Sequence, residues 1–97
     1  MNNELSELKY WLTGYLHQDF KAEFGSVDGA LIVYKTDEAP EKVEKLKHDL
    51  AEIMQSNHDE ESLRDFLLTQ IGCGYYYPSE WKSAKDWFAH LQEILNR

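Results

Sequence analysis

The sequence predicts an all-α fold, with about five helices packed into a single domain over residues 1–97. Apolar residues recur at steps of three and four along most of the chain, which is the spacing of a helix with one buried face. Capping residues stand where such stretches begin, as Ser26, Asp59 and Ser83 do. A chain of 97 residues can bury one small core. We therefore expect a short second helix enclosed by the other four.

The first predicted helix spans residues 3–16, with Asn2 or Asn3 capping its start. Its apolar stripe consists of Leu5, Leu8, Trp11, Leu12, Tyr15 and Leu16. Gly14 costs about 1 kcal/mol relative to alanine in a helix interior, so we expect the last turn to fray or bend. Trp11 and Tyr15 are expected in the core.

A polar and aromatic corner, residues 17–25, follows the first helix. Asp19 can cap a short turn through residues 20–24. We assign His17, Gln18 and Asp19 to a structural corner that holds the fold. His17 could also bind a metal together with Asp19, or act as a base. Two ligands two residues apart fall short of the three or four protein ligands of a zinc site, so a structural corner is favoured.

The second and third helices are predicted on either side of a polar loop, residues 35–39. Ser26 can cap a short helix through about Tyr34, although the β-branched residues in this run leave a buried strand open. Pro40 suits the first turn of a helix, where its missing N–H is not needed. The third helix then covers residues 41–55. Its inward stripe is Val43, Leu46, Leu50, Ile53 and Met54.

The fourth and fifth helices have their own start signals. Asp59 is expected to cap a helix over residues 60–71, and Gly72 to take the left-handed conformation after it. Ser83 and Asp86 form a variant of the capping box at the start of the last helix. The core face of that helix consists of Trp87, Phe88, Leu91, Ile94 and Leu95.

The loop between these helices, residues 73–82, carries four large aromatic side chains: Tyr75, Tyr76, Tyr77 and Trp81. So short a segment cannot bury all four. Either two of them fill the core beside Trp87, or the aromatic residues contact a partner, since tyrosine and tryptophan are enriched among residues that dominate interface energies. Stacking on single-stranded nucleic acid would require more basic residues than the segment has.

The charge is strongly acidic and unevenly distributed. The chain carries 18 acids and 10 bases, a net charge of −8. Residues 37–65 hold ten acids and four bases, a net charge of −6, whereas residues 66–97 are neutral. Nucleic acid and anionic membranes are poor partners for such a surface, and a basic protein is a good one. The alternative is a surface whose charge only keeps the protein soluble.

No catalytic constellation, metal-ligand spacing or cofactor motif stands out, so we expect no enzyme activity, no metal and no cofactor. The single cysteine, Cys73, cannot form an internal disulfide. Its glycine neighbours could expose it as a nucleophile, which would then need a histidine brought close by the fold. We expect an idle thiol. The acidic start MNNELSELK lacks the features of a signal peptide, and no apolar run is long enough to cross a bilayer. A cytoplasmic location is expected.

Two blocks of the sequence resemble a known family. The first is Tyr15-Leu16-His17-Gln18-Asp19-Phe20, followed by Phe24-Gly25-Ser26 and Ala30. The second is Ile71-Gly72, the tyrosines that run into Pro78, then Ser83 and Trp87-Phe88. Together they resemble the signature of contact-dependent growth inhibition immunity proteins. Trp81 departs from it, because a glycine is expected there.

The resemblance implies a small, mostly helical bacterial protein that binds and neutralises the toxin domain delivered by a neighbouring cell. It implies one-to-one binding that blocks the active site of a toxin, which we expect to be a basic nuclease and most often an RNase. The predicted docking residues are Glu41, Glu44, Asp59, Glu60 and Glu61, with Tyr75, Tyr76 and Trp81 as anchors. The corner is assigned to the framework rather than to toxin contacts.

Two other functions stay open from the residues alone. One is a small metal-dependent hydrolase that uses His17, Asp19 and a distant histidine. The other is an acidic adaptor, or nucleic-acid mimic, that binds basic proteins through charge.

Overall fold

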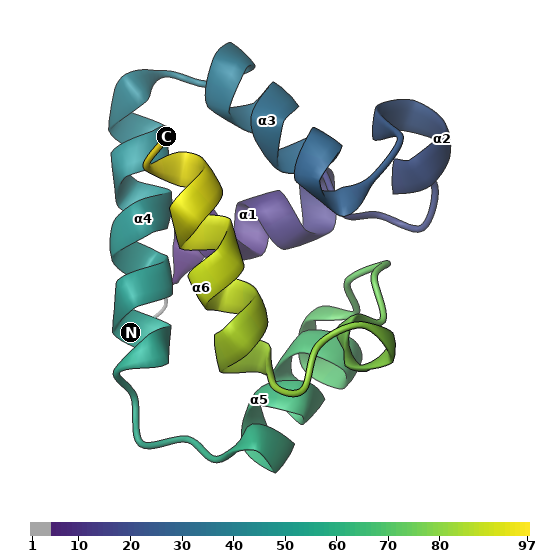
Figure 1. The fold of residues 1–97 in the computed structure, drawn as a ribbon, viewed down its shortest axis with the longest axis vertical. Coiled ribbons are helices and arrows are strands. Elements are labelled where there is room, and N and C mark those ends of the chain that lie inside the picture. The colour runs from purple at the N-terminus through teal and green to yellow at the C-terminus, as the bar shows by residue number, and fades with distance from the viewer. Residues whose placement is uncertain (1–4) are drawn as a thin grey trace.

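The computed structural model describes residues 5–97, and the residues proposed to cap the first helix, Asn2 and Asn3, lie outside this range. The described chain folds into six α-helices (Figure 1): α1 (Ser6–Gly14), α2 (Phe20–Phe24), α3 (Val27–Asp37), α4 (Pro40–Met54), α5 (Glu60–Asp65) and α6 (Ala84–Leu95). A π-helical segment, η1 (Phe66–Ile71), continues α5, and a 3₁₀ turn, η2 (Tyr77–Ser79), precedes α6. No strand occurs in residues 5–97, which confirms the all-α prediction and excludes a strand at residues 30–34.

Helix α6 is the central element of the fold. It packs against α3, α4, α5 and η2, while α1 packs against α4 and η1 (Figure 1). The predicted enclosure of the second helix is wrong, because α3 lies at the edge of the domain. Its buried residues Ala30, Leu31 and Tyr34 share one face, and the helical turn carries Ile32 outward to 49% exposure. None of the described helices is long and apolar enough to span a membrane.

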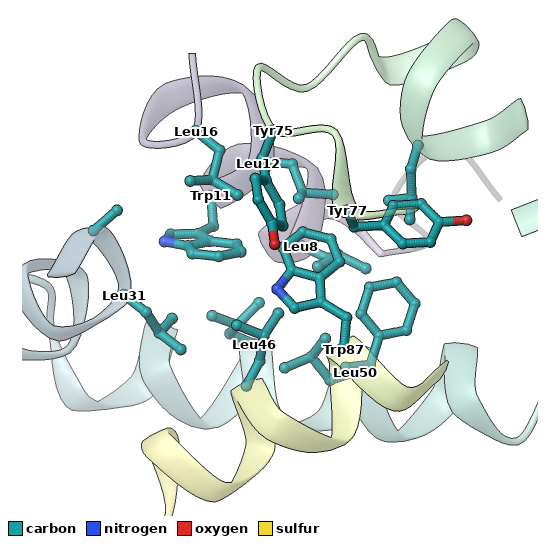
Figure 2. Close-up of a cluster of buried hydrophobic side chains, with 14 of the residues drawn as sticks. Leu8, Trp11, Leu12, Leu16, Leu31, Leu46, Leu50, Tyr75, Tyr77 and Trp87 are labelled. Atoms are coloured by element: carbon teal, nitrogen blue, oxygen red, sulfur yellow. The ribbon is translucent and has the colours of Figure 1, made fainter. Parts of the chain in front are cut away.

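The core is centred on Trp87 (Figure 2). The Tyr77 ring stacks on the Trp87 ring at 5.8 Å between centroids, and Tyr75 lies 5.2 Å away at an angle of 56°. Tyr75 and Tyr77 are therefore the two residues of the aromatic loop that fill the core. Trp11 is fully buried as expected, whereas Tyr15 is half-buried and stacks on Phe24.

The predicted caps of three helices are confirmed. The hydroxyl of Ser26 accepts a hydrogen bond from the N–H of Gly29 at 2.9 Å, and Asp59 accepts from Ser62 at 2.8 Å. Ser83 accepts from the N–H of Asp86 at 3.1 Å. These bonds satisfy N–H groups that have no partner within their own helix.

The fourth predicted helix differs in its second half. The chain is α-helical only to Asp65, and the wider π turn that follows lets the N–H groups of Gly72 and Cys73 both donate to the carbonyl of Leu67. Gly72 takes the predicted left-handed conformation, with a φ of 73°.

The start of α1 depends on a residue that no local pattern reveals. Leu5 precedes the helix at a φ of 57° and offers no side-chain cap. Instead, the buried carboxylate of Asp49, on α4, accepts hydrogen bonds from the N–H groups of Glu7 at 3.0 Å and Leu8 at 3.1 Å. Asp49 thus caps a helix 41 residues away in sequence and is only 2% exposed.

A second polar network joins α1, α3 and α4. The hydroxyl of Tyr34 donates to buried Glu7 at 2.7 Å, and the hydroxyl of Tyr15 donates to Glu38 at 2.7 Å. The ammonium of Lys42 lies 3.7 Å from both carboxylates. Burial, then the bond to Glu7, raises the pKa of Tyr34, and the bond from Tyr15 is the main cause that lowers the pKa of Glu38.

Candidate interaction site

A groove of about 880 Å³ lies between the corner, the aromatic loop and α6. Its lining includes Phe20 and Lys21 from α2, and Tyr76 and Trp81 from the aromatic loop. Trp87 lies among its lining residues. The groove therefore brings both blocks of the resemblance to one place, although about 50 residues separate them in the chain.

Gly74 sets the distance between the corner and the aromatic loop. Its N–H donates to the carbonyl of Leu16, which fixes the loop against the end of the first helix. A Cβ atom at Gly74 would lie 2.5 Å from the carbonyl carbon of His17 and 2.8 Å from the nitrogen of Gln18. Only glycine allows this approach. The ring of Phe20 packs edge-on against Tyr75, at 6.1 Å between centroids.

The part of the groove near α6 carries a contact between a histidine and a carboxylate. The Nε2 atom of His90 lies 3.0 Å from one carboxylate oxygen of Asp28 and 3.1 Å from the other. The His90 ring also packs against Trp81 at 5.0 Å between centroids. Because Asp28 belongs to the first turn of α3, these contacts connect α3, α6 and the loop.

Glu80 is an exposed carboxylate that lines the groove and is hydrogen-bonded by a buried residue. The hydroxyl of Tyr75 donates to Glu80 Oε1, and burial followed by this bond raises the pKa of Tyr75. Tyr75 is 8% exposed, so it supports the groove from below and cannot be a freely projecting anchor.

Tyr76 is the most exposed of the large aromatic residues in the loop, at 52%. Its hydroxyl accepts a hydrogen bond from Arg64 Nη2 at 2.8 Å, and the Arg64 guanidinium carbon lies 5.9 Å from the centre of its ring. Tyr76 therefore binds a guanidinium group within the chain itself.

The acids of the predicted docking face do not form one patch. Glu41 and Glu44 lie near the start of α4, whereas Asp59 and Glu61 lie at the start of α5, beyond the far end of α4. A helix of 15 residues is about 22 Å long, so α4 separates the two groups.

Glu60, one of the predicted docking residues, makes hydrogen bonds within the chain. One of its carboxylate oxygens accepts from the hydroxyl of Tyr77 at 2.6 Å, and the other accepts from the N–H of Ala84 at 2.8 Å. Glu60 is half-buried and connects α5 to the start of α6. An acid in a run of three gives no sign of this, because its partners follow 17 and 24 residues later.

The corner is built differently from the prediction. Asp19 stands at the N-cap position of α2, but its side chain makes no capping bond and is exposed. The ring of His17 accepts from the N–H of Asp19 at 3.1 Å and lies 2.8 Å from Glu23 at its other nitrogen. Gln18 is exposed and lines the groove, so it lies where a partner can reach it.

Within residues 5–97, no three His, Cys, Asp or Glu side chains come together as a metal site would require. His17 and Asp19 therefore lack the distant histidine that the hydrolase alternative needs. Burial raises the pKa of the Cys73 thiol, whose Sγ atom donates to the carbonyl of Tyr75 at 3.4 Å. A raised pKa keeps the thiol protonated and unreactive at neutral pH.

These features define an all-α protein with a preformed groove and an acidic surface. Residues 4–95 match the family model described as CdiI immunity protein, and the chain therefore belongs to this family. A chain in the crystal structure of the CdiA-CT/CdiI complex from Y. kristensenii is 33% identical. The match covers 100% of this chain and 98% of that one, with a TM-score of 0.92. No curated protein matches.

Membership confirms the predicted class of function. The chain is an immunity protein that neutralises a contact-dependent growth inhibition toxin by binding it, and it is an inhibitor and not an enzyme. The hydrolase alternative is thereby replaced. The Y. kristensenii structure is that of a complex between CdiA-CT and CdiI.

Proposed function

We propose that the chain binds its cognate toxin domain one-to-one, that the toxin is a basic nuclease, with an RNase expected, and that binding covers the active site. The observation that carries this proposal is the number of exposed acidic residues in residues 37–65. Of the ten acids in residues 37–65, Glu38, Asp49 and Glu60 are buried or half-buried, which leaves seven exposed.

Five of these exposed acids, in two separate groups, are what we call the acidic strip: Glu41, Glu44 and Glu52 on α4, and Asp59 and Glu61 at the start of α5. Glu41 and Glu52 share one outward stripe of α4, because eleven residues are about three full turns, and Glu44 lies roughly 60° to the side of Glu41. A nuclease needs positive charge to hold phosphate, so its cleft is the surface to which this field is complementary. Opposite charges speed encounter and orient the two proteins before contact.

The test begins with the cognate toxin domain of this chain. Cells that express both proteins should survive, and cells that express the toxin alone should not. With purified proteins, RNA cleavage should fall linearly as this chain is added and reach zero at one equivalent. A toxin that cleaves neither RNA nor DNA would overturn the nuclease assignment. A one-to-one complex that still cleaves would overturn active-site coverage.

A control enzyme distinguishes an immunity protein from an acidic adaptor that binds basic proteins through charge. An unrelated basic RNase of similar charge should neither be inhibited nor co-purify at 500 mM salt, a concentration at which exposed charges more than about 4–5 Å apart are largely screened. Inhibition of both enzymes, lost in parallel as salt rises, would favour the adaptor.

A further inference from the structure

We infer that the groove between the corner, the aromatic loop and α6 holds the bound toxin, and that its occupant is a toxin segment that carries an arginine side chain. The inference rests on toxin binding and deepens it, because it names the surface and the chemistry of the contact. The acidic strip then acts at longer range and does not form the closest contact.

The aromatic lining is the first reason. Four aromatic residues line the groove: Tyr76 is exposed, Trp81 is half-buried, and Tyr75 and Trp87 belong to the core. A guanidinium group is planar and weakly hydrated, so it stacks on such faces with a gain of about 0.5–2 kcal/mol. Lysine has a compact and strongly hydrated charge, which makes it the poorer occupant.

The charge of the lining is the second reason. Glu80 and Asp28 are the carboxylates of the lining and Lys21 is its lysine, and both oxygens of Asp28 already lie within 3.1 Å of His90 Nε2. Glu80 uses Oε1 to accept from Tyr75, while Oε2 makes no hydrogen bond to any residue that the structure describes. An arriving guanidinium can therefore bind Glu80 Oε2 and lie against the neighbouring aromatic rings, which combines an ion pair with stacking.

Tyr76 provides an example of this chemistry within the molecule. It already binds the guanidinium of Arg64 through its hydroxyl and ring. Arg64 lines a neighbouring hollow on the α5 side and is not among the lining residues of the groove. The guanidinium that Tyr76 already binds therefore lies outside the lining of the groove.

The rigidity of the groove is the third reason. The loop is held by Gly74 against the corner and by Tyr75 and Tyr77 in the core, so little ordering entropy is lost when a partner binds. A nuclease cleft that uses arginine to hold phosphate offers such a side chain. Its capture in the groove would remove a phosphate ligand as well as block access.

The test compares two charge reversals in the full chain, Glu80→Lys in the groove and Glu61→Lys in the acidic strip. Both replace an exposed acid and change the net charge equally. Association and dissociation rates with the purified toxin domain are measured at 50 mM and 500 mM salt. Glu80→Lys should weaken binding at least tenfold at both concentrations, mainly through faster dissociation. Glu61→Lys should slow association two- to threefold at 50 mM and have no effect at 500 mM.

A second pair guards against a folding effect of Glu80→Lys, which removes the partner of Tyr75. Gln18 is exposed, lines the groove and makes no side-chain hydrogen bond within residues 5–97. Gln18→Arg should weaken binding at least fivefold by placing a competing guanidinium in the groove, whereas Gln18→Glu should bind as tightly as the original chain or more tightly. Thermal melting should match for both.

The outcomes separate the two claims. If the original chain fails to bind and rescue, the proposed function falls, and the groove assignment falls with it. If the original chain binds but the groove and strip variants respond alike, or Gln18→Arg binds normally, the groove assignment alone is overturned.

Discussion

The groove and the acidic strip differ in how they are built and in what they can do. The part of the strip on α4 lies at the left of Figure 1, whereas α2 and the loop before α6 lie at the right. Strip residues are long exposed side chains on a helix surface, and salt screens their charges. The groove is held by buried aromatic rings and a backbone approach at Gly74. The density of acidic residues indicates the strip as the docking surface, whereas the preformed hollow that we propose for the toxin is the groove.

The largest expected effect concerns the framework that both surfaces share. Asp49→Ala should lower the free energy of unfolding by about 2–4 kcal/mol, because the buried N–H groups of Glu7 and Leu8 lose their acceptor. Urea denaturation measures the change. Glu52→Ala is the matched control, an exposed acid on the same helix, and should stay within about 0.5 kcal/mol. Equal midpoints for the two variants would contradict the assigned cap.

A change at Gly74 should separate the groove from the strip. Gly74→Ala should cost about 1–3 kcal/mol and weaken toxin binding, because the new methyl group meets the backbone of His17. Gly14→Ala is the matched control, since a methyl group added there would meet nothing within 4 Å, and it should gain about 0.5–1 kcal/mol. Calorimetric melting reads both changes. An unchanged Gly74→Ala variant would mean that the corner and the loop can move apart freely.

Alkaline titration tests the polar network that joins α1, α3 and α4. The pKa of Tyr34 is raised in the folded chain by burial and by Glu7, so stability should fall as the pH rises past about 10, where only the unfolded state ionises. Tyr34→Phe should lose about 1–2 kcal/mol at pH 7 and show a shallower decline above pH 10. Urea midpoints from pH 7 to 11 measure it. Parallel declines for the two proteins would rule out Tyr34 as a source.

The smallest effect distinguishes the corner backbone from its side chains. Asp19→Ala should change the free energy of unfolding by no more than about 0.5 kcal/mol, since the carboxylate is exposed and caps nothing. This small change is the reverse of what an aspartate at an N-cap position predicts. Thermal melting measures this change. Ser83→Ala, which removes an observed cap, is melted in parallel and shows how large the loss of a cap is in this protein. A loss at Asp19 as large as that at Ser83 would restore the capping role.

The success of sequence reasoning depended on the range of the interactions. The caps at Ser26, Asp59 and Ser83 were predicted because donor and acceptor lie three residues apart. The trans cap by Asp49 and the internal role of Glu60 were missed because their partners are distant along the chain. The same limit split the predicted docking face, since residues of one charge need not share a surface.

The aromatic loop shows what the sequence could predict and what it could not. Composition alone indicated that two of its four aromatic residues could fill the core, and the packing around Trp87 selects Tyr75 and Tyr77. Which two they are depends on how the loop meets the corner. The groove arises at that meeting, and no local pattern describes it.

Carboxylate labelling of the full chain, alone and bound to its toxin domain, tests the central claim most directly. Glu80, Glu44 and Glu61 are all exposed in the unbound chain, so each should react when no toxin is present. We predict that Glu80 becomes protected in the complex while Glu44 and Glu61 stay reactive. Protection of Glu44 and Glu61 with Glu80 still reactive would show that the toxin sits on the acidic strip and would contradict the account.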